Sequence, residues 1–158
     1  MGGLTAAYVK AGGVKFDVAT TKDITVSQDL LTHGVSTGGG LTKAGVGVLS
    51  LSGNNTYTGA TSVTAGTLNL QHNNALGTTA GATSVTTGAK LQLQGVGLNI
   101  AENLTLGTGG AGVTVENVSG TNILSGTITR NGALYFTSLA GHLTVQSGIG
   151  NTNNSVNL

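Results

Sequence analysis

Residues 40–70, GLTKAGVGVLSLSGNNTYTGATSVTAGTLNL, contain three short runs in which apolar and polar residues alternate. Alternation with a period of two is typical of strands that bury one face. A Gly-Asn-Asn turn, a Tyr-Thr-Gly step and an Ala-Gly pair separate the runs, and glycine and asparagine tolerate the backbone conformations that sharp corners need. No residue of the stretch has the pattern of a catalytic centre, so it predicts a structural unit.

The alternating pairs recur along the chain at spacings of 21 to 23 residues. Each pair has the form apolar-x-apolar, and the predicted core ladder is Ile24 and Val26, Val46 and Val48, Leu68 and Leu70, Leu91 and Leu93, Val113 and Val115, Leu134 and Phe136, and Val156 and Leu158. A second row is formed by Val63, Val85, Leu106 and Ile128, around the literal repeat ATSVT at 60–64 and 82–86. Self-similarity at such a period is typical of solenoids. The sequence therefore predicts a right-handed parallel β-helix of about seven coils of about 22 residues, with three short strands per coil.

The same stretch resembles the autotransporter-associated β-strand repeat, also called the passenger-associated transport repeat. The matching motifs are GLTK at 40–43, the spaced glycines and leucines of 45–53, NTYTG at 55–59 and AGTL at 65–68. The resemblance implies a β-helical passenger segment of a secreted or surface-displayed bacterial protein. It also implies an outer-membrane barrel in the parent protein and a passenger whose folding outside the cell helps export. It does not by itself imply an activity.

Composition narrows the classes of function further. Charged residues make up 7% of the chain and the net charge is +1, so we expect no nucleic-acid partner and no membrane insertion. The chain has no cysteine for disulfides or thiolate metal sites and no proline to interrupt a ladder. The sequence has no run of 18 apolar residues, so it predicts no membrane-spanning helix. We expect residues 1–158 to form one segment of a longer extracellular or surface-displayed passenger.

The titratable residues do not predict a catalytic, cofactor or metal site. Hydrolysis of glycosidic bonds needs two carboxyl groups facing each other. The acidic residues are Asp17, Asp23, Asp29, Glu102 and Glu116, and no two of them are separated by one coil. The histidines are His33, His72 and His142, which fall at different positions within their coils. We therefore expect solvated charges and no enzyme.

One outward pattern suggests a second kind of function. A hydroxyl stripe flanks the Val63 row at coil spacing, and its members are Ser62, Thr64, Ser84, Thr86, Thr105, Thr127 and Thr129. Flat arrays of this kind can bind ice or sugars, although serine and threonine also suit solvent-facing strand positions. The alternatives to a structural stalk are therefore an adhesin or self-associating module, an ice- or glycan-binding face, and a carbohydrate-active enzyme. Because the ends of a solenoid expose unpaired strands, end-to-end association of copies is also expected.

Overall fold

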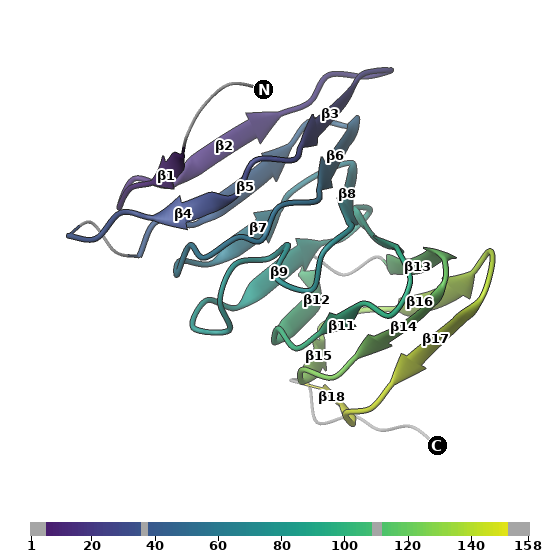
Figure 1. Ribbon diagram of the computed structural model, residues 1–158. Helices are drawn as coiled ribbons and strands as arrows, with labels where there is room; N and C mark the ends of the chain where they lie inside the picture. The colour runs from purple at the N-terminus through teal and green to yellow at the C-terminus, as the bar shows by residue number, and fades with distance from the viewer. Residues whose placement is uncertain (1–5, 36–37, 109–111, 152–158) are drawn as a thin grey trace.

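The computed structural model describes residues 6–35, 38–108 and 112–151, and within these ranges the chain forms strands, turns and no helix. Figure 1 shows the strands stacked in tiers, from the purple N-terminal strands at one end to the yellow C-terminal strands at the other. Neighbouring strands of consecutive tiers are parallel throughout, for example Leu49 opposite Leu68 and Leu68 opposite Leu91. The predicted β-solenoid is confirmed.

Two long sheets form two sides of the stack. Sheet 1 has seven strands: β2 (Val14–Asp17), β5 (Leu41–Ala44), β7 (Thr61–Val63), β9 (Thr83–Thr86), β12 (Leu104–Thr108), β15 (Ile128–Arg130) and β18 (Ile149–Asn151). Sheet 2 has six strands: β3 (Asp23–Val26), β6 (Val48–Leu51), β8 (Thr67–Leu70), β10 (Lys90–Gln94), β13 (Val113–Ser119) and β16 (Leu134–Ser138). The described residues thus make about six turns, where the sequence predicted about seven.

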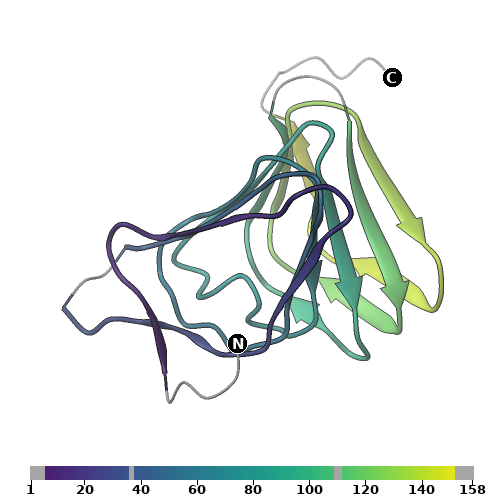
Figure 2. The same cartoon turned by 90° about the horizontal axis from the view of Figure 1, so that it is seen from above.

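The third side of the stack is built from strands only near its two ends. Its strands are β1 (Ala7–Val9) paired with β4 (Leu30–Thr32), and β11 (Asn99–Ile100), β14 (Thr121–Leu124) and β17 (His142–Val145) in a separate sheet. Between them, residues 52–60 and 71–82 form no strand. The expectation of three strands per coil therefore holds at the ends and not in the middle. Figure 2, which looks down on the stack, shows the coils as superposed three-sided outlines, with the green and yellow coils displaced to one side.

Aliphatic side chains fill the interior between the three sides. On sheet 2, Leu49, Leu68 and Leu91 lie in register and are fully buried. A second column beside them is also fully buried, and its members Leu51, Leu70 and Leu93 lie in register. Burial of a leucine side chain contributes roughly 2 kcal/mol. These columns supply the stabilisation that a single coil cannot, because one coil alone leaves its apolar face exposed.

The predicted ladder is wrong at Val46 and Val48. Val46 lies in the turn before β6 and is 59% exposed, and Val48 faces outward between Asp23 and Thr67. Leu49 and Leu51 take the interior positions instead. The reason is coil length: the step from Ile24 to its partner Leu49 is long, and the next step, to Leu68, is short. The two deviations cancel, so a constant period fits both ends of the interval and fails in the middle.

A second correction concerns β13 and the C-terminal end of the ladder. Val115, and not Val113, lies opposite Leu91, because the step between these partners is two residues longer than the period. Val113 and Val115 do lie opposite Leu134 and Phe136, as expected. Phe136 is 37% exposed, since no described coil covers it. Val156 and Leu158 lie outside the described residues.

Glycines make the corners narrow enough for coils to stack. Gly45 and Gly66 both have positive φ, 70° and 67°, at the turn from sheet 1 to sheet 2. A Cβ on Gly66 would lie 2.5 Å from the carbonyl oxygen of Gly45 in the coil below. A side chain at this corner would therefore strain the backbone and push the two coils apart.

Candidate functional site

The predicted hydroxyl stripe forms an ordered column on the outer face of sheet 1. Cross-strand pairing places Ser62 opposite Ser84, Ser84 opposite Thr105, and Thr105 opposite Thr129. Thr42, which the sequence interpretation left out, extends the column on the other side of Ser62. All five side chains are half-buried. We name these residues, Thr42, Ser62, Ser84, Thr105 and Thr129, the hydroxyl column.

The remaining stripe residues lie beside this column. Thr64 and Thr86 follow Ser62 and Ser84 by two residues and lie on the same outer face. Thr127 does not belong to the column: it precedes β15, and its hydroxyl donates a hydrogen bond of 2.6 Å to Oδ1 of Asn103. The outer face of sheet 1 therefore carries two adjacent columns of hydroxyl side chains over part of its length.

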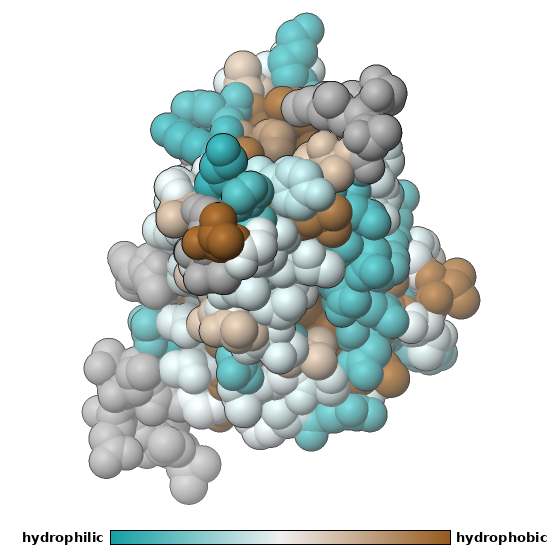
Figure 3. Space-filling model, turned by 60° about the vertical axis from the view of Figure 1, so that its left-hand side comes forward, coloured by the Kyte–Doolittle hydropathy of each residue, from teal (hydrophilic) through white to brown (hydrophobic). Residues whose placement is uncertain are grey.

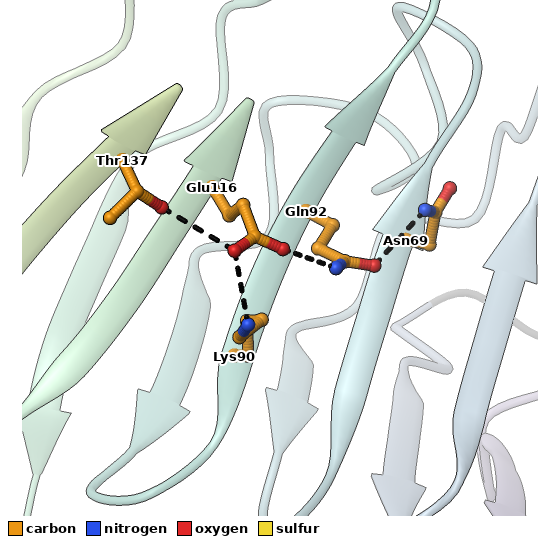
Figure 4. Close-up of polar contacts among 5 residues, drawn as sticks. All are labelled: Asn69, Lys90, Gln92, Glu116 and Thr137. Atoms are coloured by element: carbon orange, nitrogen blue, oxygen red, sulfur yellow. Dashed lines mark hydrogen bonds and ion pairs between the residues drawn. The ribbon is translucent and has the colours of Figure 1, made fainter. Parts of the chain in front are cut away.

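The outer face of sheet 2 carries a polar row centred on Glu116 (Figure 4). The Glu116 carboxylate accepts hydrogen bonds from Gln92 Nε2 at 2.5 Å and from Lys90 Nζ at 3.1 Å. Thr137 Oγ1 adds a longer contact of 3.5 Å from the next strand. The Gln92 hydrogen bond is the largest influence holding the pKa of Glu116 below its usual range, and Lys90 acts in the same direction. The charge is therefore stabilised on this face.

Asn69 continues the row toward the N-terminal coils. Its Nδ2 donates to Gln92 Oε1 at 3.2 Å and to Gln94 Oε1 at 3.0 Å. The side chain is outward-facing but only 4% exposed, because the neighbouring polar side chains cover it. The hydrogen bonds of this row connect four coils. The Glu116 carboxylate is therefore already paired with groups of the protein.

The other titratable residues are dispersed. Asp17 forms an exposed ion pair of 3.6 Å with Lys15, and Asp29 accepts a hydrogen bond of 2.7 Å from the amide of Asn54. His72 Nδ1 accepts from the amide of Asn74, and His33 packs edge-on against Tyr8. Within the part of the chain that the structure describes, no three His, Cys, Asp or Glu side chains gather closely enough to hold a metal ion.

Polar residues of the 40–70 unit lie inside the stack. The Lys43 side chain is fully buried, and its Nζ donates to the carbonyl oxygens of Ala44, Gly45 and Ala65 at 2.9, 2.7 and 3.1 Å. Burial lowers the pKa of Lys43, and the nearby charge of Asp17 opposes that effect. The ammonium satisfies carbonyls at the corner from sheet 1 to sheet 2, and so it joins two coils.

Asn55 and Tyr57 support the side of the stack that has no strand. Asn55 Oδ1 accepts from the amide of Leu30 at 2.9 Å in the preceding coil, and its Nδ2 donates to the carbonyl of Ala75 at 2.7 Å in the next. The buried Tyr57 ring packs against Gly77, and its hydroxyl lies 2.7 Å from Thr61 Oγ1. These side chains replace the ladder that strands would supply.

Sequence reasoning missed the buried roles of Lys43, Asn55, Tyr57 and Glu102. Lys43 has a signal, since it occupies a position two residues after Leu41 and two residues before Gly45, on the inward face of an alternating run. The inward direction of the Asn55 side chain could not be predicted in this way, because residues 52–60 do not form a strand with alternating faces.

Each end of the described stack has a hollow where a further coil would pack. At the N-terminal end, an apolar hollow of about 440 Å³ is lined by residues of β1 to β4, including Val9, Phe16 and Leu30. At the C-terminal end, one of about 280 Å³ is lined by residues of β16 and β17, including Phe136 and Leu143. The sides differ from the ends: Figure 3 shows one side covered mostly by residues of intermediate hydropathy, with a hydrophilic band along the stack.

The described ranges contain no helix that could cross a membrane by its length and hydropathy.

Comparisons with known proteins agree with these features. The family model of the passenger-associated-transport-repeat matches residues 41–70, the unit that contains Lys43, Asn55 and Tyr57. A curated protein described as an adhesin autotransporter, BmaC of Brucella suis biovar 1 (strain 1330), is 39% identical over 114 residues. That alignment covers 69% of this chain and 3% of the relative, so the chain spans a small fraction of the relative's length. Residues 41–70 thus carry the passenger-associated transport repeat, and the chain is similar to a small part of an autotransporter adhesin.

Proposed function

We propose that this chain is a structural stalk segment of a surface-displayed passenger, and that it acts through its stacking and not through catalysis. The observation that carries the proposal is the continuous parallel pairing from β2 to β18 in sheet 1. At about 4.8 Å between paired strands, six turns extend about 29 Å along the stack. Such a segment holds whatever lies beyond it at a fixed distance from the cell.

The open ends support a stacking role. The hollow lined by Phe16 and Leu30 and the exposed Phe136 at the opposite end both present interior side chains that a further coil would cover. Unpaired strand edges at β2 and β16 present free backbone groups in the same two places. In a longer passenger, neighbouring coils are the natural partners for both ends. Copies of the isolated chain offer the same surfaces to each other.

A stalk of this kind also favours export. Each coil that folds outside the outer membrane offers the next a complete edge, so folding proceeds coil by coil along the chain. The free energy released by stacking then opposes return through the pore of the parent protein's barrel. Because the proposed stacking takes place outside the outer membrane, we propose that the segment lies at the cell surface.

The test is a tandem of two copies joined head to tail. If coils stack across the junction, small-angle scattering should show one rod of about twice the single-copy length, and unfolding should remain a single transition. Two separately tumbling bodies with the transition of one copy would contradict the proposal. A tandem carrying Leu93→Asp in both copies is the control, because a charge buried between coils should abolish the rod.

The second candidate is an adhesive or ice-binding face on sheet 1. The observation that favours it is the register of the hydroxyl column, whose members lie opposite one another in consecutive strands. A glycan array and a thermal-hysteresis assay test the two ligands. Replacing Ser84 and Thr105 with alanine should abolish either activity while leaving the interior intact. An intact chain that is inactive in both assays would remove this candidate.

A further inference from the structure

A column of glycines marks the corner at which each coil enters sheet 1. Gly59, Gly81 and Gly126 each lie two residues before an inward-facing residue of β7, β9 or β15. A Cβ on Gly59 would lie 2.2 Å from the carbonyl of Gly38, and one on Gly81 would lie 2.3 Å from the carbonyl of Gly59. This corner therefore has no room for a side chain directed at the neighbouring backbone.

Glu102 occupies the same column position in the coil between Gly81 and Gly126. It lies two residues before Leu104 of β12, and Leu104 pairs with Thr83 below and Ile128 above. A Cβ on Gly126 would lie 2.0 Å from the Glu102 carbonyl oxygen, which confirms that the two positions are stacked. One coil thus has a carboxyl group where its neighbours have only hydrogen.

The Glu102 side chain is directed inward, and one of its carboxylate oxygens has no hydrogen-bond partner. The residue is 4% exposed, and its Oε1 is buried with no hydrogen bond. The Thr83 hydroxyl, also inward-facing and in the adjacent strand, is likewise buried and unpaired. An ionised carboxylate in such surroundings loses part of its hydration without gaining a hydrogen bond to Oε1, so burial favours the neutral acid.

Among the residues that the structure describes, no cation has a resolved influence on the Glu102 carboxyl group. The segments stacked directly against Glu102, residues 77–83 on one side and 124–128 on the other, contain no titratable side chain. Tyr57, a coil further away, is the one titratable group on which the Glu102 charge has a resolved effect, raising its pKa. The buried Lys43 lies at the opposite end of the sheet 1 strands, where its Nζ is bonded to corner carbonyls.

We propose that Glu102 makes the boundary between the coils at Thr83 and Leu104 a pH-sensitive joint, closed while the carboxyl is neutral and loosened when it ionises. Solenoids depend on contacts between nearest neighbours, so a weakened boundary lowers the local opening energy without dissolving the rest of the stack. The joint would be tight in mildly acidic surroundings and weaker in alkaline ones.

The sign follows from proton linkage. Burial raises the pKa of Glu102 to about 7 from the ordinary value of 4.5. The folded stack therefore binds more protons than the opened form between these values, and opening becomes easier as the pH rises through them. The equilibrium constant for opening should increase by roughly 100-fold between pH 4.5 and pH 8.

Native-state hydrogen exchange tests the joint. The amide of Thr83 is bonded across this boundary to the carbonyl of Asn103 at 2.9 Å, and the amide of Leu104 is bonded to the carbonyl of Thr127 at 2.8 Å in the coil on the other side. The two amides therefore report on the two sides of the Glu102 coil. After correction for intrinsic rates, their protection should fall steeply from pH 5 to pH 8. The amide of Lys90, bonded across sheet 2 to Gly66, should change much less.

Glu102→Gln keeps the size of the side chain and removes the titration, so it should make the protection of both amides independent of pH. Glu102→Gly restores the glycine found in the neighbouring coils and should do the same if the glutamine variant does not fold. Wild-type protection that does not change with pH, or an equal pH dependence in wild type and the folded variant, would overturn the proposal.

Discussion

The Lys43 ammonium donates a hydrogen bond of 3.1 Å to the carbonyl oxygen of Ala65, one coil further along the stack. The same group bonds the carbonyls of Ala44 and Gly45 within its own coil, and no carboxylate lies within ion-pair distance in the described part of the chain. A cation with three carbonyl acceptors is satisfied as a donor even where it is desolvated. Lysine in the repeat thus serves as an internal cross-brace between coils.

Lys43→Met should destabilise the chain by about 2–4 kcal/mol. The substitution roughly conserves the volume of the side chain but removes the Lys43 donor from the carbonyls of Gly45 and Ala65, whereas the carbonyl of Ala44 keeps the amide of Val18. That loss exceeds the gain from removing a desolvated charge. Urea denaturation measures the change. Lys15→Met is the matched control, because the Lys15 side chain is largely exposed, and it should change the stability by less than about 0.5 kcal/mol.

Leu49→Ala and Val46→Ala distinguish the observed register from a strictly periodic one. Leu49 is fully buried between Ile24 and Leu68, so its truncation should cost about 2–4 kcal/mol. Val46 is mostly exposed, and its truncation should cost less than about 0.5 kcal/mol. Comparable losses of free energy of unfolding for the two variants would mean that the interior column is misplaced.

Glu116→Gln should reduce stability at neutral pH and have little effect in strong acid. The pKa of Glu116 is lowered in the folded chain, chiefly by the Gln92 hydrogen bond, so its contribution is present above the ordinary value of 4.5 and disappears as the pH falls through the lowered value. We expect a loss of about 1 kcal/mol at pH 7, since the group lies on the outer face. Thermal melts of both proteins from pH 2 to pH 7 measure it, and parallel curves would contradict the assignment.

Phe136→Lys should weaken association between copies of the chain. Phe136 borders the hollow at the C-terminal end, so a charge there would have to be buried in any end-to-end contact. Sedimentation velocity over a range of concentrations should show the wild type associating and the variant remaining smaller. Val96→Lys places the same charge on an exposed turn at the side of the stack and should associate as the wild type does. A wild type that stays monomeric at every concentration would remove end-to-end stacking from the account.

The sequence predicts the architecture better than the individual contacts. The spacing between Leu68 and Leu91 equals the true offset of two paired strands, so the period identifies the solenoid. The prediction that Val46 lies in the interior is wrong, because a mean period cannot show that one coil is long and the next is short. Inward polar residues such as Asn55 are also invisible to a hydrophobic pattern, since their burial depends on backbone groups in two other coils.

The outward hydroxyl column and the buried Glu102 differ in how far the sequence predicts them. The order of Ser62, Ser84 and Thr105 follows from regular spacing and could be predicted. Glu102 has a signal for an inward position, since it lies two residues before the buried Leu104, but the missing hydrogen bond of its Oε1 depends on the neighbouring coils and could not be predicted. Coil-to-coil context, more than local sequence, decides whether an inward polar group finds a partner.

Inter-strand nuclear Overhauser effects test the stacked parallel ladder most directly. The account predicts contacts between the backbone protons of Leu49 and Leu68 and of Leu68 and Leu91, in the pattern of parallel strands, with a matching series from Ser62 to Ser84 to Thr105. An antiparallel pattern, or Leu68 paired with a strand adjacent to it in the chain, would contradict it.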